Sequence, residues 1–386
     1  MDRIKQHHHD RLRSLCGRNP DFYDFCLELA NEAATLAESR IRDNSWGLTL
    51  RARIDERIRS FQKNDLASGP EAVLLLRIAH CIVFEDADNG MLQSIVQWNE
   101  LPFRHTDSFY IGMVPSGRCH VFVTQSSPSQ WYLEVSYGFR ELLGETVIVF
   151  WESFHKRGVP NPAAYIDDSI HRILTNQLLL PYPGVADANA SATGRLALLA
   201  KMFVYSHEIG HVKARKEGMS FSNPVDEEYF ADRIGLELYI SSAMMILPPF
   251  EKFVLSGRVK NAAERRTMML GDPIFQKFMM QCAKSEASEA VDASVLSQSE
   301  LYASETELKD SGFWNGMMWA APLLVFCLLE RFEKATDAVG IENSRATHPP
   351  VRSRIEQFLA AHPDKRLRQW IESQVVPALD KVFSPA

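Results

Sequence analysis

Two histidines and a glutamate form the most chemically suggestive pattern in this sequence, in the segment His207-Glu208-Ile209-Gly210-His211. Residues four apart lie on one face of a helix, so both imidazoles can point at a single metal ion. Glu208 lies beside such a site, where it can hold a water molecule and accept its proton. The spacing is typical of zinc sites, and zinc lowers the pKa of a water molecule toward about 7. The segment therefore predicts a catalytic Zn²⁺ centre.

A catalytic zinc usually has three protein ligands and one open position, so a third ligand is expected from a neighbouring element. Glu228 and Asp232 are four residues apart and share a helix face. We predict that Glu228 binds the metal and that Asp232 steadies a ligand histidine through a hydrogen bond. Glu227 is the alternative ligand, but it has no acidic partner four residues further on. Ala231 is small, which would let the two helices approach closely.

Two helices must position these side chains. The first is predicted from Thr193, a plausible N-cap, to Lys216, with Gly218 as its stop. The second is predicted to begin after Asn223, with Pro224 at its first position, and to end near Ala243. Together they make up the predicted active-site helices, residues 193–243.

The remainder of the chain predicts an α+β fold that is mainly helical and carries a small antiparallel sheet. We predict a helical N-terminal region over 1–105 and a zinc peptidase domain over 106–386, with the sheet in 108–152 and C-terminal helices in 313–383. Short β-branched and aromatic runs predict the strands, which are 120–124, 131–135 and 146–150. Either 118–124 or 146–150 is a candidate edge strand for an extended peptide.

Composition excludes some classes of protein. The formal net charge is −7, from 42 basic and 49 acidic residues, which argues against a nucleic-acid binder. The six cysteines are scattered and include no Cys-x-x-Cys pair, which argues against a disulfide scaffold and favours a reducing compartment. The N-terminus has no apolar core of a signal peptide. These features predict a cytoplasmic protein.

Three further segments have competing interpretations. Phe313–Leu329 is apolar but short and contains Pro322, so we predict a buried core helix, with membrane association as the less favoured alternative. The run His7–His9 is interpreted as a solvated tail, with adventitious metal binding as the alternative. The acidic stretch Glu286–Asp310 is interpreted as a solvated surface, with a lid over the cleft as the alternative.

The two motifs, His207–His211 and then Glu228 to Asp232, resemble the gluzincins of the HtpX and CAAX-prenyl-endopeptidase type, which carry His-Glu-x-x-His followed by Glu-x-x-Ala-Asp. A late segment, His348-Pro349-Pro350-Val351-Arg352-Ser353-Arg354-Ile355, is similar to the family's His-Pro-Pro-x-x-x-Arg-Ile. The resemblance covers roughly 195–360 of the chain. It implies that His348 stabilises the transition state or gates the metal. The alternative is that His348 only precedes the start of a helix, before Pro349 and Pro350.

The sequence thus predicts a zinc-dependent endopeptidase that acts on a protein or peptide substrate. His207, His211 and Glu228 would bind Zn²⁺, and Glu208 would serve as general base and then as general acid to the leaving amine. Two alternatives remain open. One is a non-catalytic zinc-containing interaction protein, and the other is a triggered defence or toxin protease, by distant analogy with the Lit-type phage-exclusion proteases.

Overall fold

The structure is a computed structural model of the 386-residue chain. It describes residues 2–17, 19–39, 53–54, 56–60, 69–99, 108–155, 161–175, 177, 190–243, 305–338, 349–361 and 365–383. The predictions for His348 and for the stretch 286–304 lie outside these residues.

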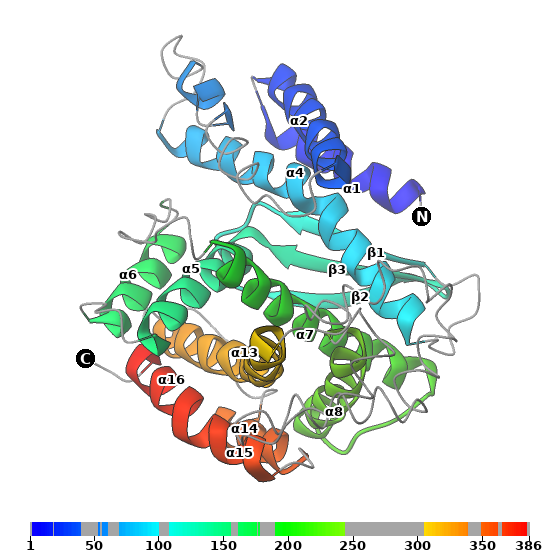
Figure 1. Ribbon diagram of the computed structural model, residues 1–386. Helices are drawn as coiled ribbons and strands as arrows, with labels where there is room; N and C mark the ends of the chain where they lie inside the picture. Colours follow the sequence, from blue (N-terminus) through cyan, green and yellow to red (C-terminus); the bar gives the residue numbers. More distant parts are fainter. Residues whose placement is uncertain are drawn as a thin grey trace.

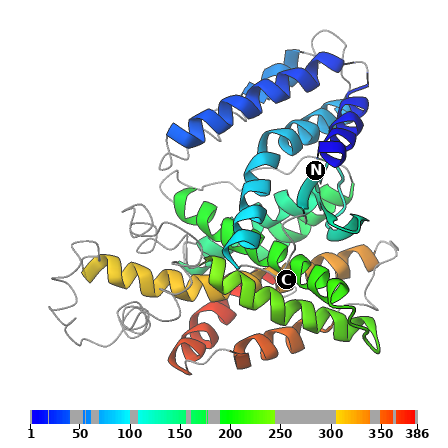
Figure 2. The ribbon, with the colours of Figure 1, turned by 90° about the vertical axis from the view of Figure 1, so that its right-hand side faces the viewer.

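Helices dominate the fold and surround one small sheet (Figures 1 and 2). The helices are α1 (Asp2–Leu15), α2 (Pro20–Ser39), α4 (Gly69–Trp98), α5 (Tyr137–Phe154), α6 (Pro162–Leu174), α7 (Ala190–Lys216), α8 (Pro224–Ala243), α13 (Glu305–Ala338), α14 (Val351–Ala361), α15 (Lys365–Trp370) and α16 (Val376–Phe383), with a π-helical turn η3 (Ile371–Val375) before α16. Helix α7 lies at the centre of Figure 1 and contacts α4, α5, α8, α13 and the sheet. The α+β class predicted from the sequence is confirmed at this level.

The sheet has the strand order β1-β3-β2, from β1 (Ser108–Val114), β2 (Val121–Ser127) and β3 (Gln130–Ser136). Strands β2 and β3 form an antiparallel hairpin, but β1 runs parallel to β3. The prediction of an antiparallel sheet is therefore wrong for β1. The local sequence does not encode this direction, because β1 pairs with β3 across the intervening strand β2 rather than with its neighbour in sequence.

Residues 146–150 do not form the predicted strand and lie within helix α5. Ser136 caps this helix by accepting a hydrogen bond from the backbone N–H of Phe139 at 3.2 Å. Thr146, Val147 and Phe150 are all buried, so tertiary packing on several sides outweighs the weak strand preference of β-branched residues.

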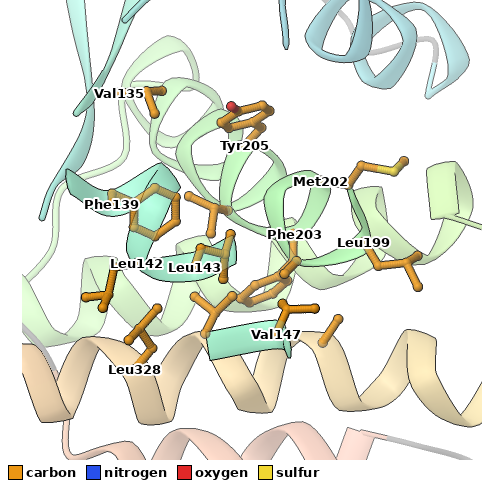
Figure 3. Close-up of a cluster of buried hydrophobic side chains, with 14 of the residues drawn as sticks. Val135, Phe139, Leu142, Leu143, Val147, Leu199, Met202, Phe203, Tyr205 and Leu328 are labelled. Carbon is orange, nitrogen blue, oxygen red and sulfur yellow. The ribbon is translucent and has the colours of Figure 1, made fainter. Parts of the chain in front are cut away.

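The core near the centre of the molecule joins the sheet to three helices (Figure 3). Its labelled members are Val135 of β3; Phe139, Leu142, Leu143 and Val147 of α5; Leu199, Met202, Phe203 and Tyr205 of α7; and Leu328 of α13. This packing holds α7 from one side, which leaves its other side to face α8 and β2.

The end of α7 and the start of α8 agree with the sequence signals at Gly218 and Pro224. Gly218 has a positive φ of 63°, and the following Met219 N–H donates to the carbonyl of Ala214 at 3.0 Å, which closes α7. Pro224 is the first residue of α8, and Asn223 Oδ1 accepts from the N–H of Asp226 at 2.9 Å. The start of α7 differs, because the helix begins three residues before Thr193.

The axes of α7 and α8 approach closely at Gly210. A Cβ added there would lie 2.8 Å from the Ala231 Cα and 2.8 Å from the Ala231 carbonyl oxygen, so only glycine fits. Ala231 is itself fully buried. The expected role of Ala231 in close helix approach is therefore confirmed, and Gly210 provides the matching half of the contact.

The apolar segment of α13 is buried in the core from Met317 to Val325. The prediction of a core helix is confirmed for this stretch. In the described parts of the chain, none of the helices combines the length and the apolar character that crossing a membrane requires.

The N-terminal histidines are not a solvated tail, and that prediction is wrong. They belong to α1, where His7 is exposed, His8 is 3% exposed and His9 is half-buried. Consecutive helical residues point in different directions, so one turn can both face water and reach the interior. His8 Nε2 lies 3.0 Å from Glu85 Oε2, and His9 Nε2 lies 3.1 Å from Glu85 Oε1. These two ion pairs fasten α1 to α4.

Candidate metal centre

The structure brings the three predicted ligand residues together between α7 and α8. His207 Nε2 and His211 Nε2 are 3.2 Å apart. One oxygen of Glu228 lies 3.4 Å from His207 Nε2, and the other lies 3.5 Å from His211 Nε2. Each of the three side chains offers one ligand atom, and these atoms lie within 4.8 Å of one another, close enough to hold one metal ion.

These separations fit the size of a zinc coordination shell. Zinc bonds of about 2.0–2.2 Å in a tetrahedron place neighbouring ligand atoms roughly 3.3–3.5 Å apart. The two histidine nitrogens are 3.2 Å apart and lie 3.4 and 3.5 Å from two different oxygens of Glu228, so the donor groups are separated on the same scale. Two nitrogens and a carboxylate are also the donors that catalytic zinc sites use. The donor set therefore fits Zn²⁺ in both chemistry and spacing.

A buried chain of charges orients the first ligand. His207 Nδ1 lies 2.9 Å from Asp232 Oδ1, so the other ring nitrogen, Nε2, faces His211 and Glu228. Arg354 of α14 donates to the two oxygens of Asp232, at 2.7 Å through Nε and 2.5 Å through Nη2. Its guanidinium also lies over the Phe326 ring, 4.1 Å from the centroid. Asp232 thus occupies the position predicted for it, whereas the partner role of Arg354 was not predicted.

Glu227 orients the second ligand in the same manner. Its Oε1 lies 2.9 Å from His211 Nδ1, on the side of the ring opposite Nε2. The sequence left Glu227 and Glu228 as competing ligands. The structure gives them different positions, with Glu228 beside the other two ligand atoms and Glu227 behind His211. Because adjacent helical residues differ by about 100° in direction, the two carboxylates can reach the two different nitrogens of the His211 ring.

Charges around the site hold the two imidazoles in different protonation states when no metal is bound. Burial lowers the pKa of His207, but hydrogen bonds with Asp232 and Glu228 outweigh it and raise that pKa to about 10. Burial and then the charge of His207 lower the pKa of His211 to about 4. Two imidazolium groups cannot occupy adjacent sites at this distance, so only one of the two rings is positively charged. A divalent cation would replace the proton that gives this ring its charge.

Glu208 is 7% exposed and lies on the turn between the two histidines. Burial raises the pKa of its carboxyl group to about 7, although the charge of His207 and a hydrogen bond from the Val123 backbone N–H oppose the shift. Arg215 donates through Nη1 to the Val123 carbonyl at 3.0 Å. The backbone of Val123 therefore joins strand β2 to two residues of α7, Arg215 and the candidate catalytic residue Glu208.

A cavity of about 450 Å³ opens onto these residues. Its walls come from β2, α7, α8, α13 and the start of α14, and they include His207, Glu208, His211 and Glu228. Pro349, which follows His348 directly, also lines the cavity. The volume lies within the range of small-molecule and peptide subsites.

Comparison with known proteins gives no relative: no family model matches the chain, and neither the curated proteins nor the solved structures contain a significant match.

Proposed function

We propose that this protein is a zinc-dependent endopeptidase of gluzincin type that hydrolyses peptide bonds in a protein substrate. The observation that carries the proposal is that two histidine nitrogens and a glutamate carboxylate lie within 4.8 Å of one another on the wall of the cavity. His207, His211 and Glu228 would hold the metal. A structural zinc would have no use for the buried carboxyl group of Glu208 beside it.

The chain's own groups supply the proton transfers. Zinc, when bound, would polarise a water molecule and the substrate carbonyl. The Glu208 carboxylate would accept a proton from this water molecule and return it to the leaving amine. The Val123 N–H and the buried surroundings hold this carboxylate in place. Asp232 and Glu227 keep each imidazole turned toward the metal position.

Strand β2 supports an extended peptide as the substrate. It is an outer strand of the sheet, and the alternation of an antiparallel ladder turns the backbone groups of Val121, Val123 and Gln125 away from β3. Those of Val123 already bond to Glu208 and Arg215, so an added peptide would pair with the backbone of Val121 and Gln125 on either side. A peptide added beside this edge would therefore pass the catalytic carboxylate. Of the two predicted edge segments, only 118–124 is available for this role, because 146–150 is helical.

The test compares wild type with Glu208→Gln. Both proteins are purified, their zinc content is measured, and each is incubated with a cell lysate whose new N-termini are mapped by mass spectrometry. We expect about one zinc per chain in both proteins and a loss of cleavage by roughly 10²–10⁴-fold in the variant. Gln keeps the size of the side chain, so a change in zinc content would indicate a misfolded control.

Two results would contradict the proposal. Zinc in the wild type without any cleavage that depends on Glu208 would favour a zinc-containing interaction protein. Absence of zinc would exclude both interpretations.

The five cysteines in the described residues are free, which supports a reducing compartment such as the cytoplasm as the place of action.

A further inference from the structure

A polar stripe runs along the face of α7 that carries Glu208. Lys201, Tyr205, Glu208 and Arg215 follow one another by four, three and seven residues, so they lie on the same side of the helix. The two candidate ligand histidines project from a neighbouring face toward α8. The contacts of the stripe therefore fix the rotation of α7 about its own axis and the direction of the Glu208 side chain.

The C-terminal half of the stripe is anchored to strand β2. The Val123 N–H donates to the Glu208 carboxyl group, and Arg215 Nη1 donates to the Val123 carbonyl at 3.0 Å. One residue of β2 thus holds two residues of α7 that are about two helical turns apart. A rotation of α7 would disturb both contacts.

The N-terminal half of the stripe is anchored to a carboxylate of α4. Asp88 is 0% exposed, and Lys201 Nζ donates to its Oδ1 at 2.7 Å. Arg140 of α5 donates to its other oxygen, Oδ2, at 3.1 Å. Burial raises the pKa of Asp88, but the charges of Lys201 and Arg140 outweigh it and hold that pKa below its usual value. Asp88 is therefore a buried anion that fastens α7 and α5 to α4.

Tyr205 is the second residue of α7 that interacts with Asp88. Its side chain is fully buried, and burial together with the charge of Asp88 raises the pKa of its hydroxyl group well above the ordinary value. The hydroxyl group stays protonated and stabilises the anionic form of Asp88. Because Lys201 and Tyr205 are one turn apart, Asp88 fixes the turn of α7 that comes directly before His207 and Glu208.

We propose that Asp88 and Lys201 are positioning residues, which fix the rotation of α7 and so hold the Glu208 carboxylate where it can act. The inference rests on the proposed peptidase function. A side-chain carboxylate lies about 5–6 Å from the axis of its helix, so a rotation of about 10° moves it by about 1 Å. A misplacement of that size can cost about 100-fold in rate. Helix α4, in the predicted N-terminal region, thereby contributes to peptide-bond hydrolysis.

The test uses Lys201→Met, which removes the cation on α7 and leaves Asp88 its second partner, Arg140. Lys213→Met is the matched control on the same helix, since Lys213 only approaches Glu217, at 3.9 Å, near the surface. The kcat and KM values are measured on a fluorogenic peptide made from a cleavage site of the wild-type protein. We expect kcat to fall by roughly 10–100-fold in Lys201→Met with little change in KM. The control should keep the wild-type values.

A second measurement does not require cleavage. Backbone hydrogen exchange is recorded at residue resolution for the purified proteins in the presence of Zn²⁺. In Lys201→Met the Val123 amide should exchange at least about tenfold faster than in wild type, because its bond to Glu208 opens more often. The amide of Leu133, a fully buried residue of the central strand β3, should keep its protection.

A milder variant covers the case in which Lys201→Met does not fold, as judged by circular dichroism. Tyr205→Phe removes only the hydroxyl group that interacts with Asp88, and it should change kcat and Val123 exchange in the same direction by a smaller factor. Tyr239→Phe of α8 is its control, because this tyrosine is equally buried and donates instead to the Met318 carbonyl at 2.6 Å.

The outcomes separate the two proposals. Unchanged kcat and unchanged Val123 exchange in Lys201→Met would overturn the positioning role and leave the peptidase intact. Equal acceleration at Val123 and Leu133 would also overturn it, because the ion pair would then support only the stability of the whole fold. Absence of cleavage by the wild type would contradict the peptidase, and Val123 exchange would still decide whether the pair positions Glu208.

Discussion

Gly235 of α8 lies directly against the backbone of His207 of α7: a Cβ at position 235 would come within 2.7 Å of the His207 Cα and 2.8 Å of its nitrogen. Together with Gly210 against Ala231, this contact sets the distance between the two helices that carry the candidate metal centre. The positions of Glu228 and Asp232 relative to the histidines depend on that distance.

Gly235→Ala is therefore expected to push α8 away from α7. The variant should bind zinc more weakly and lose about 1–3 kcal/mol of stability through overpacking. Zinc titration and urea denaturation measure the two effects. Gly144→Ala in α5 is the control, since no atom lies within 4 Å of the added Cβ and alanine favours the helix by about 0.5–1 kcal/mol. A Gly235→Ala protein with unchanged zinc affinity would refute this role for the contact.

Arg354→Met should damage the metal centre from a distance. The substitution leaves the Asp232 carboxylate buried without its guanidinium partner, which costs about 3–5 kcal/mol of folding stability. Zinc affinity should fall by roughly 10–100-fold, because Asp232 no longer holds His207 firmly. Arg352→Met is the matched control on the same helix, since the Arg352 side chain is 92% exposed. Equal effects of the two substitutions would exclude the proposed chain of charges.

The two neighbouring glutamates should differ in their contribution to zinc binding. Glu228→Gln removes a ligand and should abolish stoichiometric zinc. Glu227→Gln removes only the carboxylate behind His211 and should weaken zinc binding by roughly 10–100-fold. Equilibrium competition with a zinc chelator measures both. The reverse order of effects would mean that Glu227 is the ligand.

Acid should release α1 from α4. Burial raises the pKa of Glu85, but hydrogen bonds from His8 and His9 outweigh it and lower the pKa to about 2. Because the folded pKa lies below the unfolded value, this carboxylate stabilises the fold above about pH 4.5, and the stabilisation is lost as the pH falls toward 2. The effect is on the order of 3 kcal/mol.

Denaturation of wild type and Glu85→Gln at pH 7, 5, 4 and 3 tests this expectation. The variant should be less stable at pH 7 and should lose less stability than wild type between pH 5 and 3. Parallel pH profiles for the two proteins would show that Glu85 does not titrate in this range.

The sequence predicts the site better than it predicts the sheet, for physical reasons. His207, His211 and Glu228 depend on helical spacing within α7 and α8, whose ends are marked by local signals at Gly218 and Pro224. Arg354 lies 122 residues beyond Asp232, and no local pattern assigns such a partner. The run 146–150 has strand-like residues, yet burial within α5 decides its conformation. The direction of β1 depends in the same way on long-range pairing.

The distance in sequence between Asp232 and Arg354 also determines when, during synthesis, the candidate metal centre can become complete. During synthesis, His207, His211 and Glu228 leave the ribosome long before α14 does. Until Arg354 arrives, the nascent chain has its metal donors but not the cation that neutralises Asp232. Asp232 therefore remains a carboxylate without its cationic partner beside His207 until helix α14 has been synthesised and has docked.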